Sequence, residues 1–413
     1  MQCSWKTVIL LALVSMPIQY TAMKIFMDLF VHKSQIPNLM NFGLGKDVKS
    51  FDRICDDYLY CNCSFSRKTH ILILATTRSG STFVGQLFNQ YPDVFYLFEP
   101  LYHVQMTFIP HLSPSRYAVE HRVMLGASRD LLRSLYNCDL YFLENYIKPR
   151  PARHTTDKLF RRGASKALCS MPVCDAFSPS YGNIEEGDCV RKCASLNLTL
   201  ATESCRERRH MAIKTVRIPE VNDLKALIED PRLNLKVIQL VRDPRGILFS
   251  RIETFRDTYR LWRIWRDTGR KPYNLDLTQL TTVCDDFLNS VSTGLSRPPW
   301  LRGRYMLLSM VLKSDCILEL LGSNKTFPSF FFCYSTSRDS AANAVNWTLK
   351  LSHDIVDYTQ TVCQQFLDKL SYKAVNSPEK LKNIAVSVRT KPSYLFFFFV
   401  IKTIMHTDIY SFI

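Results

Sequence analysis

The segment from His70 to Phe83 constrains the fold of this 413-residue chain more than any other. It begins as an apolar run typical of a buried β-strand, continues as a turn of small hydroxyl-bearing residues, and ends in a pattern that predicts an amphipathic helix from about Ser81. Successive backbone N–H groups of such a turn point toward one position, and the positive end of the helix dipole lies beside that position. The segment therefore predicts an anion site, with a nucleotide phosphate as the first candidate ligand.

The turn is similar to the phosphate-binding loop of nucleotide kinases but lacks its lysine. Ala75 stands where the first glycine of the G-x-x-x-x-G-K-[ST] pattern belongs, and Ser81 stands where the lysine belongs. The cation is Arg78, inside the turn. A kinase needs the lysine and Mg²⁺ to neutralise a triphosphate, whereas Arg78 and backbone dipoles suit a donor with a single 5′ anhydride. A P-loop nucleotide kinase remains an alternative.

A second corner is expected after the apolar run 235–241, which predicts a buried parallel strand. Asp243 followed by Pro244 has the form of a helix N-cap and a first helical residue, so a helix should begin there. Arg242 would then lie at the strand's carboxyl end and Ser250 on the helix. If this corner and the turn at 76–83 lie at neighbouring strand ends, each can bind one phosphate of a nucleotide that carries a phosphate at both ends. Alternatively, Arg242 and Ser250 are ordinary solvent-exposed residues at the start of a helix, with no ligand to bind.

Three runs taken together resemble the Golgi carbohydrate 6-O-sulfotransferases. They are Thr-Thr-Arg-Ser-Gly-Ser-Thr-Phe at 76–83, Leu-Phe-Glu-Pro-Leu-Tyr-His-Val at 97–104 and Val-Arg-Asp-Pro-Arg-Gly-Ile-Leu at 241–248. The similarity covers about 66–307 and 336–373, and it is greatest to the members that sulfate galactose in keratan sulfate. The resemblance implies a P-loop-like α/β sulfotransferase fold, with a central parallel sheet flanked by helices, that transfers a sulfuryl group from 3′-phosphoadenylyl sulfate (PAPS) to the 6-hydroxyl of a sugar.

The resemblance also implies which residues bind PAPS, with no metal involved. One segment binds the 5′-phosphosulfate and the other binds the 3′-phosphate, where Arg242 and Ser250 are the expected direct contacts. The first comprises Thr77, Arg78, Ser79, Gly80, Ser81, Thr82 and Phe83. The second comprises Arg242, Asp243, Pro244, Arg245, Gly246, Ile247, Leu248, Phe249 and Ser250.

Two catalytic residues are expected, Arg78 and Glu99. In-line sulfuryl transfer develops charge on oxygen, which Arg78 and the amides of its turn are placed to stabilise. The acceptor hydroxyl also needs a general base. Glu99 follows the apolar run 94–98 and should lie at another strand end, where partial burial would raise the pKa of its carboxyl. His103 is the second candidate for the base, and an ion pair with a cleft arginine is the alternative role for Glu99.

The composition agrees with an acidic glycan or proteoglycan as acceptor. The chain has 53 Lys and Arg against 37 Asp and Glu, a formal charge of +16 that would attract a polyanion. Between 251 and 270 arginines alternate with aromatic residues, whose rings either pack in the core or stack on sugars or bases. No zinc-finger or RNA-recognition signature is present, so no nucleic acid partner is expected. The oligomeric state stays open.

The first residues predict a membrane segment, because the chain is uncharged from Thr7 to Met23. A cleavable signal peptide is the alternative. The resemblance implies a type II signal-anchor in the Golgi membrane over 1–23, a stem over 24–65 and a luminal sulfotransferase domain over 66–390.

The cysteines agree with an oxidising compartment, where disulfides are expected rather than a zinc site. Five crowd into one loop-like insertion, and their connectivity is open: Cys169, Cys174, Cys189, Cys193 and Cys205. Three lie in the stem: Cys55, Cys61 and Cys63. Four glycosylation sequons are candidates on a luminal protein: Asn62, Asn197, Asn324 and Asn346.

Two segments depart from the family pattern. Residues 308–335 are shorter than their family counterpart and lack its Arg-Tyr-Glu-Asp strand end, and the hydrophobic tail 391–413 has no counterpart. Arg338, after the first break, resembles a family position near the nucleotide. A glycan-binding homologue without transfer activity is therefore an alternative function. A second alternative is 6-O-sulfation of N-acetylglucosamine or N-acetylgalactosamine, as in chondroitin, instead of galactose.

Overall fold

The computed structural model describes residues 68–109, 117–178, 184–309 and 345–382. The expected signal-anchor at 1–23, the stem at 24–65 and the tail at 391–413 lie outside the described residues, as does the altered segment beyond residue 309. Within the described ranges, no helix has the length and apolar character needed to cross a bilayer.

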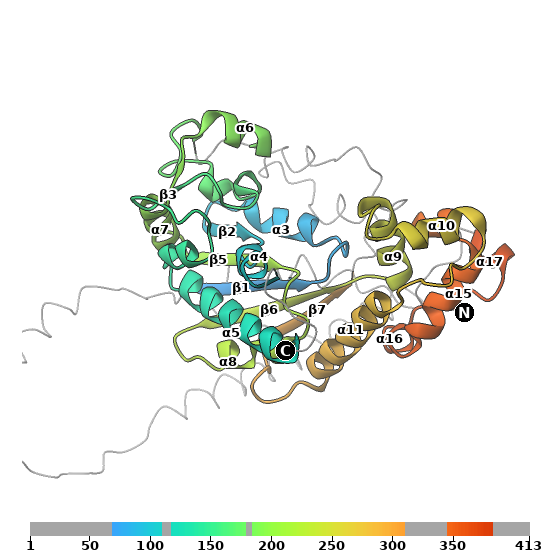
Figure 1. The fold of residues 1–413 in the computed structure, drawn as a ribbon. Helices are drawn as coiled ribbons and strands as arrows, with labels where there is room; N and C mark the ends of the chain where they lie inside the picture. Colours follow the sequence, from blue (N-terminus) through green and yellow to red (C-terminus); the bar gives the residue numbers. More distant parts are fainter. Residues whose placement is uncertain (1–67, 110–116, 179–183, 310–344, 383–413) are drawn as a thin grey trace, which may run out of the picture. The chain divides into compact units, whose positions relative to one another are not determined.

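A parallel sheet forms the centre of the described region (Figure 1). Its five strands lie in the order β2 (Val94–Phe98), β5 (His210–Thr215), β1 (Thr69–Ala75), β6 (Asn234–Val241) and β7 (Tyr305–Ser309). In the central register, Leu74 of β1 lies opposite Thr215 on one side and Gln239 on the other. The carboxyl ends of β5, β1 and β6 therefore meet at one edge, as expected for an α/β fold of this type.

Helices cover both faces of the sheet, which confirms the predicted layers. Leu72 and Leu74 of β1 face a core that includes residues of α5 (Tyr117–Tyr136). Ile71 and Ile73 face the opposite core, which includes residues of α3 (Ser81–Asn89). Burial on both faces explains why these strands are apolar almost throughout.

A further helical region packs around its own core, which includes Val241 at the end of β6. Its helices are α9 (Pro244–Thr254), α10 (Arg260–Thr268), α11 (Thr278–Ser296), α14 (Trp347–Lys350), α15 (His353–Val362), α16 (Gln364–Lys369) and α17 (Pro378–Lys382). Trp262 and Trp265 of α10 stack with their ring centroids 5.6 Å apart, and each is 3% exposed. These rings therefore pack in the core, so they do not offer a stacking surface for sugars or bases.

Shorter elements complete the described chain: α4 (Tyr102–Phe108), η5 (Leu140–Asn145), β3 (Thr155–Thr156), η6 (Arg162–Ala164), η7 (Lys166–Leu168), α6 (Glu186–Lys192), β4 (Leu196–Asn197), α7 (Leu198–Glu207), η8 (Val221–Leu224) and α8 (Lys225–Ile228). Strands β3 and β4 pair antiparallel. Asn197, one of the sequon residues, caps α7 by accepting from the N–H groups of Thr199 and Leu200.

The five cysteines of the insertion all form disulfides, as predicted. Two link the insertion internally, Cys169–Cys189 and Cys174–Cys193, and a third joins Cys205 to Cys138 near the end of α5. A fourth, Cys284–Cys363, ties α11 to the end of α15. The sequence predicted disulfides here, but the pairs follow from the folded positions of the cysteines.

Candidate functional site

The turn between β1 and α3 has the strand, turn and helix geometry that the sequence predicts for an anion site. Arg78 and Gly80 have φ angles of 74° and 92°, which curl the turn back on itself. The Ser79 N–H and Oγ–H both donate to the carbonyl oxygen of Thr76, at 3.2 and 2.7 Å. No side chain caps the N-terminus of α3. Because the first N–H groups of a helix lack intrahelical partners, those around Ser81 can bind an anion.

The second corner folds as predicted and contacts the first. Asp243 caps α9, accepting a 2.9 Å hydrogen bond from the Arg245 N–H, and Pro244 is the first helical residue. Arg78 Nε donates to Ser250 Oγ at 2.9 Å, and an Arg242 guanidinium nitrogen donates to the Arg78 carbonyl oxygen at 3.0 Å. We call residues 76–83 and 242–251 together the arginine corner.

Arg251 is a further link in the arginine corner, and the sequence analysis assigned it no role at the site. Its guanidinium donates to Thr76 Oγ1 at 3.0 Å and to the Thr77 carbonyl oxygen at 3.4 Å. It also donates to the Tyr259 hydroxyl at 3.2 Å. Arg251 therefore connects the turn to the segment that leads into α10.

Arg242 lies close along the first turn of α9, where a side chain at Gly246 would be crowded. A Cβ at Gly246 would come within 3.3 Å of Arg242 Nε and 3.2 Å of the Trp347 ring. Burial lowers the pKa of Arg242, Asp243 offsets part of this effect, and Arg78 lowers the pKa further. The crowding of two guanidinium groups is electrostatically unfavourable without an anion, so the corner favours a negatively charged ligand.

The other residues of the second segment serve mainly the fold. The Arg245 guanidinium is completely buried, pairs with Asp243 and lies 4.5 Å over the Trp347 ring. Ile247 and Leu248 are each 2% exposed in the core. Their side chains pack in this core, which leaves their backbone groups as the atoms available to a ligand. In the first segment Thr82 and Phe83 are exposed, and Ser79 and Ser81 are buried.

Glu99 follows β2, as predicted, and is 2% exposed. Its carboxylate accepts hydrogen bonds from the Lys214 ammonium and the Arg217 guanidinium, and from the Val216 N–H at 3.3 Å. The ion pair considered as its alternative role is therefore present, with two cations instead of one. Burial lowers the pKa of Lys214, while Glu99 opposes this shift. Lys214 lies near the end of β5 and Arg217 just after it, so both cations come from the carboxyl end of the neighbouring strand.

His103 is buried on α4, and its ring accepts a 3.0 Å hydrogen bond from the Phe160 N–H at Nε2. Burial, and then Arg217, lower the pKa of His103 to about 4. The Nε2 lone pair is occupied and the imidazole is a weak base. The Glu99 carboxylate also accepts hydrogen bonds, from three groups, but its two oxygens offer about four acceptor sites, so Glu99 stays the first candidate for the base.

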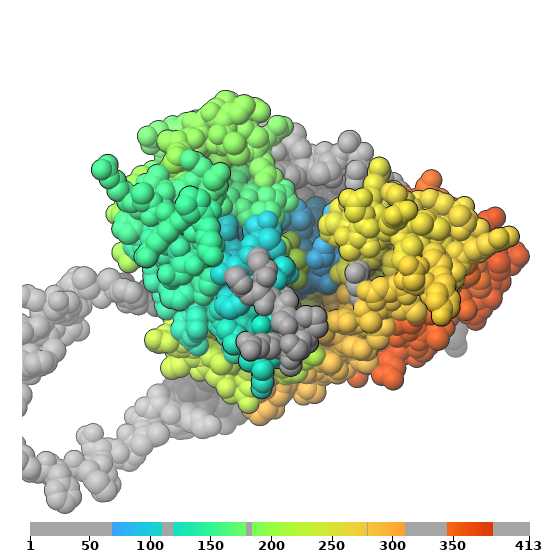
Figure 2. Space-filling model, viewed as in Figure 1, coloured from blue at the N-terminus to red at the C-terminus, as the bar shows by residue number. Residues whose placement is uncertain are grey.

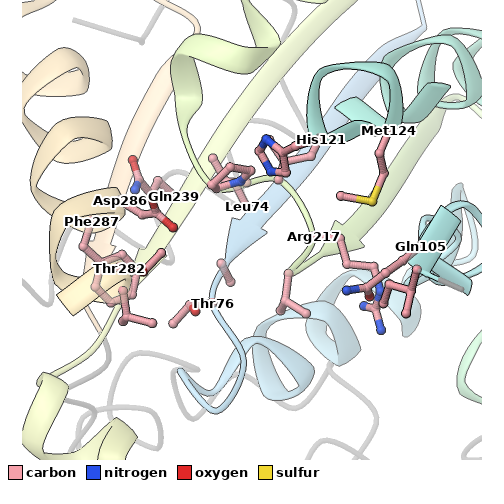
Figure 3. A pocket seen from close by; sticks show the side chains of 16 residues that line it. Leu74, Thr76, Gln105, His121, Met124, Arg217, Gln239, Thr282, Asp286 and Phe287 are labelled. Carbon is pink, nitrogen blue, oxygen red and sulfur yellow. The ribbon is translucent and has the colours of Figure 1, made fainter. Parts of the chain in front are cut away.

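A pocket of about 320 Å³ opens at the same sheet edge, between α4, α5 and α11 (Figure 3). We call it the edge pocket. Asp286 and Thr282 of α11 lie on one side of it, Arg217 and Gln105 on the other, and Leu74 and Thr76 between them. Its polar lining residues are Thr76, Gln105, His121, Arg217, Gln239, Thr282 and Asp286.

Asp286 gives the edge pocket an acidic side. Burial raises the pKa of its carboxyl to about 6, with further increases from Glu220, Asp223 and Asp285. No sequence pattern predicted a role for Asp286, because it lies in no motif and meets its neighbours through tertiary packing.

The surface is hollowed where these parts meet. In Figure 2 the blue atoms of the β1 and α3 region lie recessed between the cyan segment that contains α4 and the gold segment that contains α10. The β1–α3 region, which contains the turn at 76–83, thus lies in a surface depression that is open to ligands.

Comparison of the sequence with known proteins identifies the family of this chain. A model of the sulfotransferase domain matches residues 68–310. Carbohydrate sulfotransferase 1 of Danio rerio is 77% identical over 410 residues, which cover 94% of this chain and 98% of the relative. The human protein of that name is 60% identical over 409 residues, with the same coverage. Carbohydrate sulfotransferase 3 of Tetronarce californica is 38% identical over 342 residues, covering 78% of this chain and 76% of the relative. These similarities confirm the resemblance seen in the motifs: the chain belongs to the sulfotransferase family, among its carbohydrate sulfotransferases.

Proposed function

We propose that this enzyme transfers the sulfuryl group of PAPS to the 6-hydroxyl of galactose in keratan sulfate or related N-acetyllactosamine glycans. The observation that carries the proposal is the direct contact between the two predicted donor segments, through Arg78 with Ser250 and Arg242 with the Arg78 carbonyl. The similarity to proteins named carbohydrate sulfotransferase 1 supports a sugar acceptor.

The residues of the arginine corner fit PAPS. The uncapped N-terminus of α3 and Arg78 suit the 5′-phosphosulfate, and Arg242 with Ser250 suits the 3′-phosphate. Asp243 does not oppose an anion there, because its carboxylate is paired with Arg245. When bound, PAPS supplies an activated sulfuryl group on a phosphosulfate anhydride.

The chain's own contribution to the reaction is positioning and electrostatics. Arg78 and the N–H groups of its turn stabilise the negative charge that develops on oxygen. Glu99 accepts the proton of the attacking 6-hydroxyl, and Lys214 and Arg217 hold its carboxylate in place. Burial keeps water away from this proton transfer.

The cellular setting is part of the proposal. A type II anchor at 1–23 would hold the catalytic region in the Golgi lumen, where an acidic glycan or proteoglycan is the acceptor. The disulfides within the described region agree with an oxidising compartment.

Transfer of radiolabelled sulfate from PAPS to desulfated keratan sulfate tests the proposal. We expect incorporation at galactose O6, located by digestion and linkage analysis. Label only on N-acetylhexosamine would overturn the acceptor assignment. Retention of glycan without incorporation would favour the glycan-binding homologue, and ATP turnover would favour the kinase.

A further inference from the structure

The edge pocket touches both parts of the proposed catalytic machinery. Thr76 lines it and accepts a hydrogen bond from Arg251 of the arginine corner. Arg217 also lines it and pairs with Glu99. A molecule that fills this pocket therefore contacts Thr76 of the arginine corner and Arg217, which pairs with the proposed base.

The pocket offers hydrogen-bonding groups that the fold leaves unused. The Asp286 carboxylate and the Gln105 amide make no hydrogen bond within the part of the chain that the structure describes, and the buried Arg217 Nε–H likewise has no hydrogen-bond partner there. Gln239, in contrast, already accepts a 2.6 Å hydrogen bond from the Tyr305 hydroxyl. Acceptors and donors on opposite walls match sugar hydroxyls, which both donate and accept.

The size of the pocket limits what it holds. Its volume of about 320 Å³ lies at the low end of ligand pockets, which span about 300–1,000 Å³. Apolar surface from Phe287 and Val283 adjoins the polar groups. One sugar ring, with a polar rim and an apolar face, has this character.

We propose that the edge pocket binds an uncharged hexose of the acceptor, and that Asp286 determines specificity by accepting its hydroxyl hydrogen bonds and by repelling a sugar that carries a carboxylate. The inference rests on the proposed function and deepens it. It separates acceptors whose repeat has no carboxylate, such as keratan, from acceptors that alternate with a uronate, such as chondroitin.

The charges around Asp286 support this selectivity. Glu220, Asp223 and Asp285 all act on it, and burial raises its pKa to about 6. The carboxylate of a uronate on this side of the pocket would be repelled by these carboxylates. Salt screens the repulsion only weakly, because the charges are partly buried. A neutral hexose would meet charge-assisted acceptors instead.

The test compares Asp286→Asn with wild type on desulfated keratan and on desulfated chondroitin, using the full chain and labelled PAPS. The amide keeps the shape and removes the charge. We expect the ratio of kcat/KM for chondroitin to that for keratan to rise about tenfold, which corresponds to about 1.4 kcal/mol. The matched control is Asp357→Asn on α15, an exposed aspartate that neither lines the pocket nor acts on Asp286, and its ratio should stay at the wild-type value.

The outcomes separate this inference from the function it rests on. If wild type transfers sulfate to neither glycan, the proposed function fails. If wild type is active and Asp286→Asn leaves the ratio unchanged, or lowers both activities equally, the inference is overturned. A selective rise in the KM for PAPS would assign the pocket to the donor and would also overturn it. Asp286→Glu keeps the charge and should keep the discrimination.

Discussion

The arginine corner and the edge pocket lie at one edge of the same sheet, yet their charges differ. In the corner Arg78, Arg242 and Arg251 converge on backbone and hydroxyl oxygens. In the pocket Arg217 faces a wall that contains Asp286, beside further carboxylates. The strands behind both places are similarly apolar, so the turns and helices that follow them create the difference. An anionic donor and an uncharged acceptor can thus be bound side by side.

The largest effect is expected when the positive charge of Arg78, at the centre of the arginine corner, is removed, because this abolishes the charge difference between the corner and the pocket. Arg78→Ala should lower kcat/KM about 10³-fold, at the upper end of what one lost charge-stabilising donor costs. Sulfate transfer from labelled PAPS measures it, with Arg256→Ala as the matched control because that arginine is exposed and makes no ion pair in the described region. Near wild-type turnover in Arg78→Ala would contradict the donor assignment.

Glu99→Gln tests whether the buried carboxylate acts in chemistry or only in structure. We expect kcat to fall about 10²-fold with an unchanged KM for PAPS, since a lost general base affects the transition state. Glu144→Gln is the control, because Glu144 is also buried and pairs with His154 at 2.7 Å, outside the site. Collapse of donor binding in Glu99→Gln would make the residue structural, as its pairs with Lys214 and Arg217 allow.

Gly246→Ala should act on the corner alone. The added Cβ would press on Arg242 and the Trp347 ring, so the KM for PAPS should rise several-fold, and the keratan to chondroitin preference should not change. Gly126→Ala on α5 is the control, because its nearest neighbour is the end of the Arg129 side chain at 4.0 Å. A changed acceptor preference in Gly246→Ala would mean that the corner and the pocket are not separate.

The smallest expected effect is a pH dependence of the pocket. The pKa of Asp286 is raised to about 6, so its carboxyl is mostly neutral below that pH and mostly charged above it. Relative activity on chondroitin should therefore fall as pH rises through about 6. The pocket also contains His121 and Arg217, and Glu220, Asp223 and Asp285 act on Asp286, so the profile is compared with that of Asp286→Asn. Parallel profiles in the two proteins would contradict the role of Asp286.

Local sequence patterns predicted the parts of the site that local physics determines. The apolar run 94–98 is strand β2, and Asp243 with Pro244 begins α9. The turn at 76–83 leads into a helix at Ser81. In each case the residue types favour one backbone conformation. Because the carboxyl ends of parallel strands lie at one edge of a sheet, the two corners could also be predicted to lie at the same edge.

Partners across the fold could not be predicted in this way. Arg251 reaches Thr76 from far along the sequence, and Glu99 meets Lys214 and Arg217 because β2 lies beside β5 in the sheet. Asp286 lines a pocket because α11 packs near the sheet edge. None of these contacts follows from spacing along the chain, because strand order and helix packing determine them.

The central claim is that the arginine corner holds the two ends of one doubly phosphorylated adenosine. Calorimetric titration of the purified chain with adenosine 3′,5′-bisphosphate and with adenosine 5′-monophosphate tests it most directly. We predict that Arg242→Ala weakens binding of the bisphosphate about 100-fold, or about 2.7 kcal/mol, and leaves the monophosphate nearly unchanged, while Arg78→Ala weakens both. An equal loss for both nucleotides in Arg242→Ala, or no binding of the bisphosphate to wild type, would contradict the account.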